Sequence, residues 1–99
     1  MSERRNGRRV LIRRKVDVVW EKGQATAWGR DIGIGGMYVQ CKGCPEAGED
    51  VRLMVRFHRA PAVTIPAQVC WSDEEGFAVR FVGLGKFETD TIRRVIEGG

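Results

Sequence analysis

The sequence predicts an all-β domain of about six short strands followed by one short C-terminal helix, arranged as a small antiparallel barrel or closed sandwich. From Val10 onward apolar residues recur with a period of two, the spacing at which one face of a strand is buried. The runs are short and separated by tight turns, which is typical of a small barrel or closed sandwich. A chain of 99 residues is long enough for one domain, which we expect to span residues 1–99.

The first half of the chain predicts three strands. In the first, Val16, Val18 and Trp20 share the buried face, and the run stops at a turn over residues 21–23. Residues 25–30 return as the second strand of a hairpin. After the glycine-rich segment 31–36, residues 37–40 form a third strand, and a polar loop follows up to residue 50.

The second half shows the clearest alternation. Its three predicted strands have buried faces made of Val51, Leu53, Val55 and Phe57, then Val63, Ile65, Ala67, Val69 and Trp71, then Phe77, Val79 and Phe81. Pro66 has no N–H for a ladder bond, so we expect its strand to lie at a sheet edge or to bulge there. In the tail, the apolar spacing predicts a helix with Thr89 as its N-cap and Gly98 at its end.

Positive charge is concentrated at the N-terminus. The formal net charge is +4, but residues 1–15 contain seven Lys or Arg and one Glu, so they carry +6 and the remainder −2. A basic arm on a nearly neutral body indicates an anionic partner: nucleic acid, an acidic lipid surface or a small phosphate ligand. No segment is apolar enough to span a bilayer and the first residues lack a secretory signal, so we expect a cytoplasmic protein without membrane insertion.

The cysteines and the histidine give little support to catalysis. Cys41, Cys44 and Cys70 are too few for a disulfide scaffold, and we expect reduced thiols. Cys41 and Cys44 have redox or zinc spacing, but a structural zinc site needs four ligands, so we expect neither a metal nor a required disulfide. His58 lies on the polar face of a strand, between arginines. We therefore expect no enzyme activity and no cofactor.

Two segments could bind an anionic ligand. The arm, expected to be flexible over residues 1–9, contains four arginines, whose guanidinium groups bind phosphates and stack on purines. Such a terminus can equally be a solubilising charge cluster. The segment 31–36 lacks the third glycine and the following helix of a dinucleotide fold. It is either a tight turn or, combined with the arm, a place where a carboxylate and amides recognise a guanine edge.

These segments together resemble the PilZ domains, bacterial receptors for the second messenger cyclic di-GMP. That family has R-x-x-x-R near its start and (D/N)-x-S-x-x-G a few tens of residues later, on a six-stranded barrel with a C-terminal helix. Both motifs are matched here in order, by Arg5 and Arg9, by the overlapping pair Arg4 and Arg8, and by Asp31 and Gly36. Gly33 departs from the pattern, because the family has serine there.

The resemblance implies a ligand site made of Arg4, Arg5, Arg9, Asp31, Gly33, Gly36 and Trp71. The arginines would bind phosphates and guanines, Asp31 would accept hydrogen bonds from a guanine edge, and Gly36 would let the backbone turn beneath it. Trp71 falls in the inward register of its strand, so it could equally be a core residue. The missing serine hydroxyl removes ~1 kcal/mol of hydrogen bonding, so restoring it with Gly33→Ser is expected to tighten binding a few-fold.

The implied function is a cyclic di-GMP receptor or adaptor that changes conformation or partner surface on binding, passes the signal to a protein effector, and orders its arm over the ligand. The alternative is a PilZ-like adaptor that does not bind cyclic di-GMP, for which Gly33 is the evidence. A nucleic-acid binder is disfavoured, because the body is net negative and shows no array of exposed aromatics. We therefore expect no nucleic-acid polymer as partner.

Overall fold

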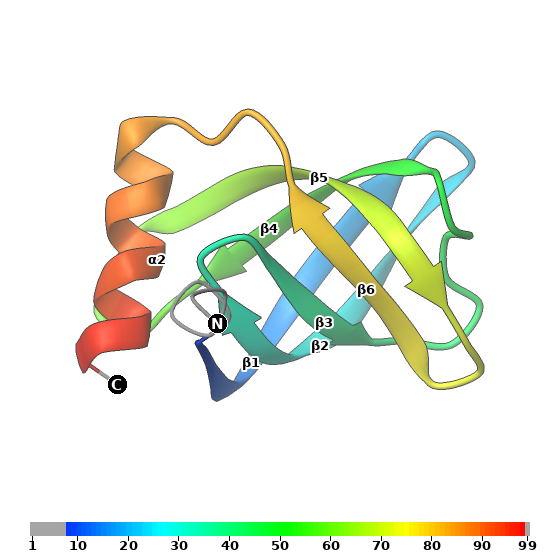
Figure 1. Ribbon diagram of the computed structural model, residues 1–99. Helices are drawn as coiled ribbons and strands as arrows, with labels where there is room; N and C mark the ends of the chain where they lie inside the picture. The colour runs from blue at the N-terminus through cyan, green and yellow to red at the C-terminus, as the bar shows by residue number, and fades with distance from the viewer. Residues whose placement is uncertain (1–7, 99) are drawn as a thin grey trace, which may run out of the picture.

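A closed barrel of six antiparallel strands forms the body of the protein, as the sequence predicts (Figure 1). The computed structural model describes residues 8–98. The elements are β1 (Arg9–Trp20), β2 (Gly23–Gly33), β3 (Gly36–Gln40), β4 (Asp50–Arg56), β5 (Ala62–Ser72), β6 (Gly76–Phe81) and α2 (Lys86–Gly98). Around the barrel the order is β1-β2-β3-β6-β5-β4, and β1 closes it by pairing with both β2 and β4.

Closure leaves no sheet edge for Pro66, and the ladder does not bulge at this residue. The Pro66 carbonyl oxygen accepts a hydrogen bond from the Val82 nitrogen at 2.9 Å, so the proline nitrogen faces the β6 side of its strand. There β6 has already ended, because its last residue, Phe81, pairs with Ala67. The missing N–H therefore falls beyond the end of the ladder, where it costs no strand hydrogen bond.

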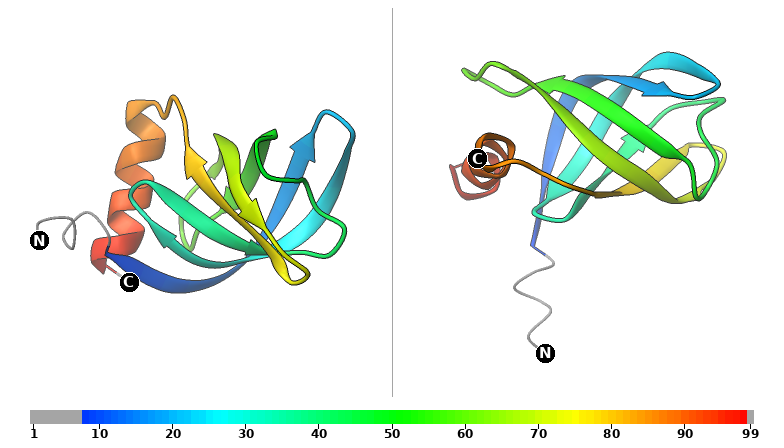
Figure 2. Two further views of the ribbon diagram at one scale, coloured as in Figure 1. Left: turned by 45° about the vertical axis from the view of Figure 1, so that its right-hand side comes forward. Right: turned by 90° about the horizontal axis from the view of Figure 1, so that it is seen from above.

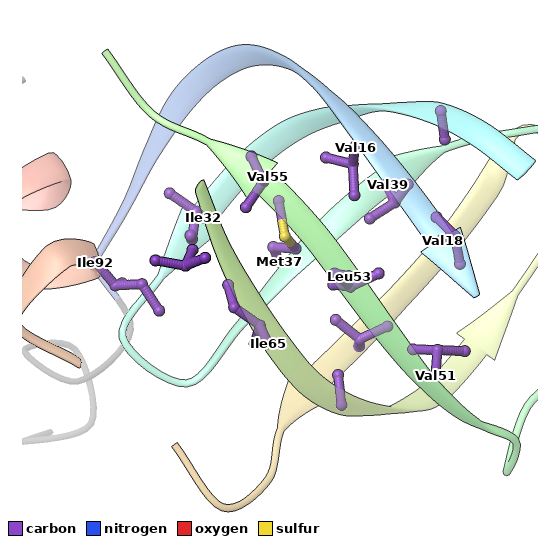
Figure 3. Packing of buried hydrophobic residues seen from close by; sticks show 14 of the residues in the cluster. Val16, Val18, Ile32, Met37, Val39, Val51, Leu53, Val55, Ile65 and Ile92 are labelled. Carbon is purple, nitrogen blue, oxygen red and sulfur yellow. The ribbon is translucent and has the colours of Figure 1, made fainter. Parts of the chain in front are cut away.

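The core fills the barrel interior with the alternating residues that the sequence places on buried faces (Figure 3). Branched aliphatic side chains from every strand meet there, together with Met37 and Phe77. Val16, Leu53, Ile65 and Val39 are completely excluded from solvent. This packing holds the outer surface of the strands rigid, which is where polar residues can be positioned for binding.

The helix α2 covers one open end of the barrel (Figures 1 and 2). Ile92 points from α2 into the barrel toward Ile32, and Ile96 is also buried (Figure 3). The predicted N-cap is wrong: α2 begins at Lys86, and Thr89 lies inside it, its nitrogen donating to the Gly85 carbonyl oxygen at 3.0 Å. The predicted end at Gly98 is confirmed. No helix among residues 8–98 combines the length and apolar character needed to cross a membrane.

The expectation of reduced thiols is wrong for two of the three cysteines. Cys41 and Cys44 form a disulfide across a loop of two residues, with their Cα atoms 5.9 Å apart. Gly43 in this loop has a φ of +67°, which lets the chain reverse tightly enough to bring the sulfurs together. Cys70 is free and exposed. Counting cysteines could not reveal this bridge, because it depends on the loop conformation.

Candidate functional site

Arg9 and Asp31 form an ion pair on the outer face of the barrel. Arg9 opens β1 opposite Gly33, and Asp31 lies two residues before Gly33 on β2. The two side chains are therefore diagonal neighbours on the same face. The Arg9 Nε donates to Asp31 Oδ1 at 2.7 Å, and a second guanidinium nitrogen also contacts this oxygen. The structure thus brings together one residue from each of the two sequence motifs.

This ion pair is available to a ligand. The Arg9 side chain is 44% exposed and that of Asp31 is 29% exposed, so solvent screens their attraction. Such a pair contributes about 0 to 1 kcal/mol to folding. Among residues 8–98, no side chain or backbone group donates to Asp31 Oδ2. A bound group can therefore donate a hydrogen bond to the free carboxylate oxygen of Asp31 and accept one from the guanidinium of Arg9.

Gly33 lies beneath the start of β1. A Cβ at this position would come within 2.9 Å of the Arg8 carbonyl oxygen and 3.3 Å of the Arg9 Cγ. The space that the family's serine would need is thus taken by the chain entering β1. The φ of Gly33 is not positive, so serine can adopt the backbone conformation, but crowding by the Arg8 backbone works against the binding gain expected from Gly33→Ser.

Gly36 serves a different purpose from the one that the motif suggests. It is the first residue of β3 and pairs with Arg80 of β6, without the positive φ of a turn glycine. A Cβ here would overlap the Val79 carbonyl oxygen. Gly36 is therefore needed for the close approach of β3 to β6, and we correct its role from a ligand-facing turn to strand packing.

A row of paired residues extends from Asp31 across the outer face. Asp31 pairs with Tyr38 of β3, Tyr38 pairs with Ala78 of β6, and Ala78 pairs with Trp71 of β5. Paired residues point to the same side of a sheet, so all four share the face that carries Arg9. Three strand spacings separate Asp31 from Trp71, about 14 Å along the row.

The inward register expected for Trp71 is wrong. Val69 pairs with Val79 while Trp71 pairs with Ala78, so β5 has one extra residue, Cys70, at this point. Such a bulge moves the next side chain to the opposite face. The Trp71 side chain is accordingly 50% exposed. It lies on the outer face as a binding residue would.

Tyr38 is a further member of this face that sequence reasoning missed. Its ring lies 5.7 Å from the ring of Trp71, centroid to centroid, with the planes tilted by 32°. The signal available in the sequence was its position in β3, between Met37 and Val39, which both face the core. The half-buried ring of Tyr38 and the exposed ring of Trp71 form an aromatic surface on the face that carries the Arg9 and Asp31 pair.

Tyr38 also provides a titration test of this geometry. Partial burial raises its pKa above the ordinary value of 10.0, and the carboxylates of Asp73 and Glu75 raise it further. Because Tyr38 is the one tyrosine of the chain, tyrosinate absorbance reports it alone. We expect a midpoint above 10.0 in the folded protein, and Asp73→Asn should move it back toward that value.

The sign of the linkage follows from the raised pKa. The folded state holds the phenolic proton more tightly than the unfolded chain, so this contribution to stability is complete below the unfolded pKa of about 10 and is lost at higher pH. The urea-unfolded chain is the control and should titrate at its ordinary value. A folded midpoint at or below 10.0 would contradict the placement of Tyr38 near Asp73.

The arm is only partly covered by the described residues. Arg4 and Arg5 lie outside them, so their predicted roles stay predictions. The expected boundary of the arm at residue 9 is shifted, because Arg9 already belongs to β1. Cys41 and Cys44, being bonded to each other, have no free thiolates for a metal, and no group of three or more His, Cys, Asp or Glu side chains gathers within residues 8–98.

Comparison with known proteins gives one family. A model of the PilZ domain matches residues 3–98. No curated protein matches the chain. The solved structure of the Bacillus subtilis inhibitor of motility (MotI/DgrA) is similar, with a TM-score of 0.77 and 16% identity over 91% of this chain and 48% of that one. The PilZ domain of CeSA from a cellulose-synthesizing bacterium has a TM-score of 0.74 and 15% identity over 91% of this chain and 95% of that one. This chain therefore spans about half the length of the Bacillus protein, and both structures share its fold.

Proposed function

We propose, from the premise that this chain belongs to the PilZ domain family, that it is a receptor for cyclic di-GMP and not an enzyme. The ligand would bind on the outer face along the row from Asp31 to Trp71. The observation that carries this proposal is that the Arg9 and Asp31 pair and the aromatic pair of Tyr38 and Trp71 share this face. We further propose that it acts in the bacterial cytoplasm.

Each group on this face suits one part of a cyclic dinucleotide. The guanidinium of Arg9 can bind a phosphate through two N–H groups or stack on a purine. The carboxylate of Asp31 can accept hydrogen bonds from the donor edge of guanine. The half-buried ring of Tyr38 and the exposed ring of Trp71 offer an apolar surface for a base, and they lie one and three strand spacings from Asp31, respectively. Arg4 and Arg5 would add phosphate contacts from the arm.

Binding would have its effect through a second protein. A ligand that bridges the arm and the barrel neutralises the basic N-terminus and changes the surface that a protein effector meets. The Bacillus structure, named as an inhibitor of motility, contains this fold as about half of its chain. We therefore propose that a protein effector reads the bound state.

An adaptor that does not bind cyclic di-GMP is the second candidate, and Gly33 is the observation that favours it. The structure supplies a different reason for this glycine. The space above it holds the Arg8 carbonyl oxygen and the Arg9 side chain. The absence of a side chain at Gly33 therefore lets the Arg9 guanidinium lie next to the second motif. This supports the receptor hypothesis over the adaptor hypothesis.

Calorimetric titration separates the candidates. We expect cyclic di-GMP to bind at micromolar affinity or better, and an unrelated single-stranded oligonucleotide of equal total charge to bind much more weakly. Heat from the oligonucleotide alone would favour a nucleic-acid binder. The absence of heat from either ligand would favour the adaptor and overturn the proposed function.

Gly33→Ser is expected to weaken cyclic di-GMP binding several-fold, the reverse of what the motif alone suggests. The serine Cβ would push the Arg8 carbonyl oxygen away and displace Arg9 from Asp31. Such overpacking also costs about 1 to 3 kcal/mol of folding stability. Gly35→Ser is the matched control, because a Cβ there meets nothing within 4 Å. Tighter binding by Gly33→Ser would show that the hydroxyl matters more than the space.

A further inference from the structure

A second basic surface lies at the end of the barrel that α2 covers. Residues from the first half of β1, the turn between β4 and β5, and α2 line a cleft of about 490 Å³. The residues that line it are Leu11, Ile12, Arg13, Arg14, Phe57, His58, Arg59, Ala60, Thr91, Arg94 and Val95. None of these is a residue of the row from Asp31 to Trp71, but Leu11 adjoins that row because it pairs with Asp31.

The charged side chains of this cleft are all basic. Among residues 8–98, four arginines and one histidine line it and no carboxylate does. Within residues 8–98 none of these arginines forms an ion pair. Like charges gathered in a concave site repel one another, which an anionic ligand would relieve.

The helix α2 contributes an arginine but no carboxylate to the cleft. Thr91, Arg94 and Val95 lie on the helix face toward the cleft, as residues three and four apart do. Asp90 does not line the cleft and forms ion pairs with Lys86 at 3.1 Å and with Arg93 at 3.8 Å. Two carboxylates, Asp90 and Glu97, lie one helical turn from Arg94, and within residues 8–98 neither forms an ion pair with it.

Arg59 is the second observation that favours a ligand. It has a φ of +58° in the turn closed by the Ala60 nitrogen and the Phe57 carbonyl oxygen, 3.2 Å apart. Glycine would adopt this conformation without strain, whereas arginine costs about 1 kcal/mol or more. The turn itself does not need an arginine. Binding of an anion by the Arg59 guanidinium would explain why an arginine is present at this position.

The cleft also has an apolar part. Ile12, Phe57 and Val95 lie among the cations, and Leu11 at the rim is 82% exposed. The volume is within the range of small-molecule sites, about 300 to 1,000 Å³. Arginines beside an apolar surface fit a ligand with clustered phosphates and a less polar moiety.

We propose that this cleft binds a small molecule that carries a di- or triphosphate group, such as a nucleoside di- or triphosphate. The phosphates would lie among Arg14, Arg59 and Arg94, and the remainder of the molecule against Leu11. This site goes beyond the proposed cyclic di-GMP receptor. Leu11 pairs with Asp31 and so adjoins the row, but Arg14, Arg59 and Arg94 belong neither to the row nor to the Arg9 pair, so variants of these arginines test the cleft separately from that function.

The test is a calorimetric titration of the whole chain with inorganic pyrophosphate and with adenosine triphosphate, at fixed ionic strength. We expect both to bind, the triphosphate more tightly, and Arg94→Gln to weaken binding by at least about fivefold through loss of a charge-assisted hydrogen bond. Arg93→Gln is the matched control, because Arg93 is the next helix residue and pairs with Asp90 outside the cleft. It should bind within about twofold of the unchanged protein.

Arg59→Gly separates binding from folding. Glycine suits the positive φ, so this variant should be at least as stable while its pyrophosphate affinity falls by at least about fivefold. Equal losses in Arg93→Gln and Arg94→Gln would overturn the site, as would sulfate binding as tightly as pyrophosphate. Binding to anionic lipid vesicles without binding to soluble pyrophosphate would also overturn it.

Discussion

Replacing Gly36 with alanine is expected to lower the free energy of unfolding by about 3 kcal/mol, the upper end of what overpacking costs. The added Cβ would overlap the Val79 carbonyl oxygen in the neighbouring strand. Backbone atoms of a closed barrel cannot rotate away as a side chain can, so β3 and β6 must separate. The loss is a large part of the 5 to 15 kcal/mol that a small domain typically has.

Urea unfolding of Gly36→Ala measures this loss, and the neighbouring residue supplies the control. A Cβ at Gly35 meets nothing within 4 Å, and Gly35 has no positive φ. Gly35→Ala should therefore leave stability unchanged or raise it by up to about 1 kcal/mol through the unfolded state. Equal unfolding midpoints for the two variants would contradict the close approach of β3 to β6.

Arg9→Ala is expected to weaken cyclic di-GMP binding at least tenfold. A charge-assisted hydrogen bond contributes about 1.5 to 3 kcal/mol, and about 1.4 kcal/mol corresponds to a factor of ten. The stability of the domain should change by about 1 kcal/mol or less, because the ion pair with Asp31 is exposed to solvent. A large effect on binding with a small effect on folding is thus the signature of a ligand residue.

A double-mutant cycle tests whether Arg9 and Asp31 act together. If Arg9 positions the carboxylate, the losses in Arg9→Ala and Asp31→Ala should add to more than the loss in the double variant. Arg93→Ala on α2 controls for net charge, because it removes the same charge at a residue paired with Asp90. Equal affinities for Arg9→Ala and the unchanged protein would remove Arg9 from the site.

The strands could be predicted because burial in a barrel imposes a period of two on the sequence. Leu53 and Ile65 are buried as their alternation requires. Trp71 shows where this reasoning stops. The extra residue at Cys70 moves the side chains that follow it in β5 to the opposite face of the strand. The apolar character of Trp71 is compatible with a buried position, so the sequence does not reveal this change.

The candidate site could be predicted where residues belong to recognisable motifs, and the family resemblance added Trp71 from outside them. Arg9 and Asp31 are such motif residues, and the pairing of β1 with β2 brings them together. Tyr38 was missed because its role depends on strand order: β3 lies between β2 and β6 only in the closed barrel. The crowding at Gly33 by Arg8 likewise depends on tertiary contacts, which the motif does not encode, so the motif and the structure lead to opposite predictions for a serine substitution.

Backbone amide chemical shifts of the isotope-labelled chain, recorded during titration with cyclic di-GMP, locate the ligand on the surface of the protein. If the ligand binds to the outer face from Arg9 to Trp71, the largest shifts will occur at Arg9, Asp31, Gly33, Tyr38 and Trp71, with small shifts at Arg94. Largest shifts around Arg94, or no shifts at saturating ligand, would show that this face does not bind cyclic di-GMP.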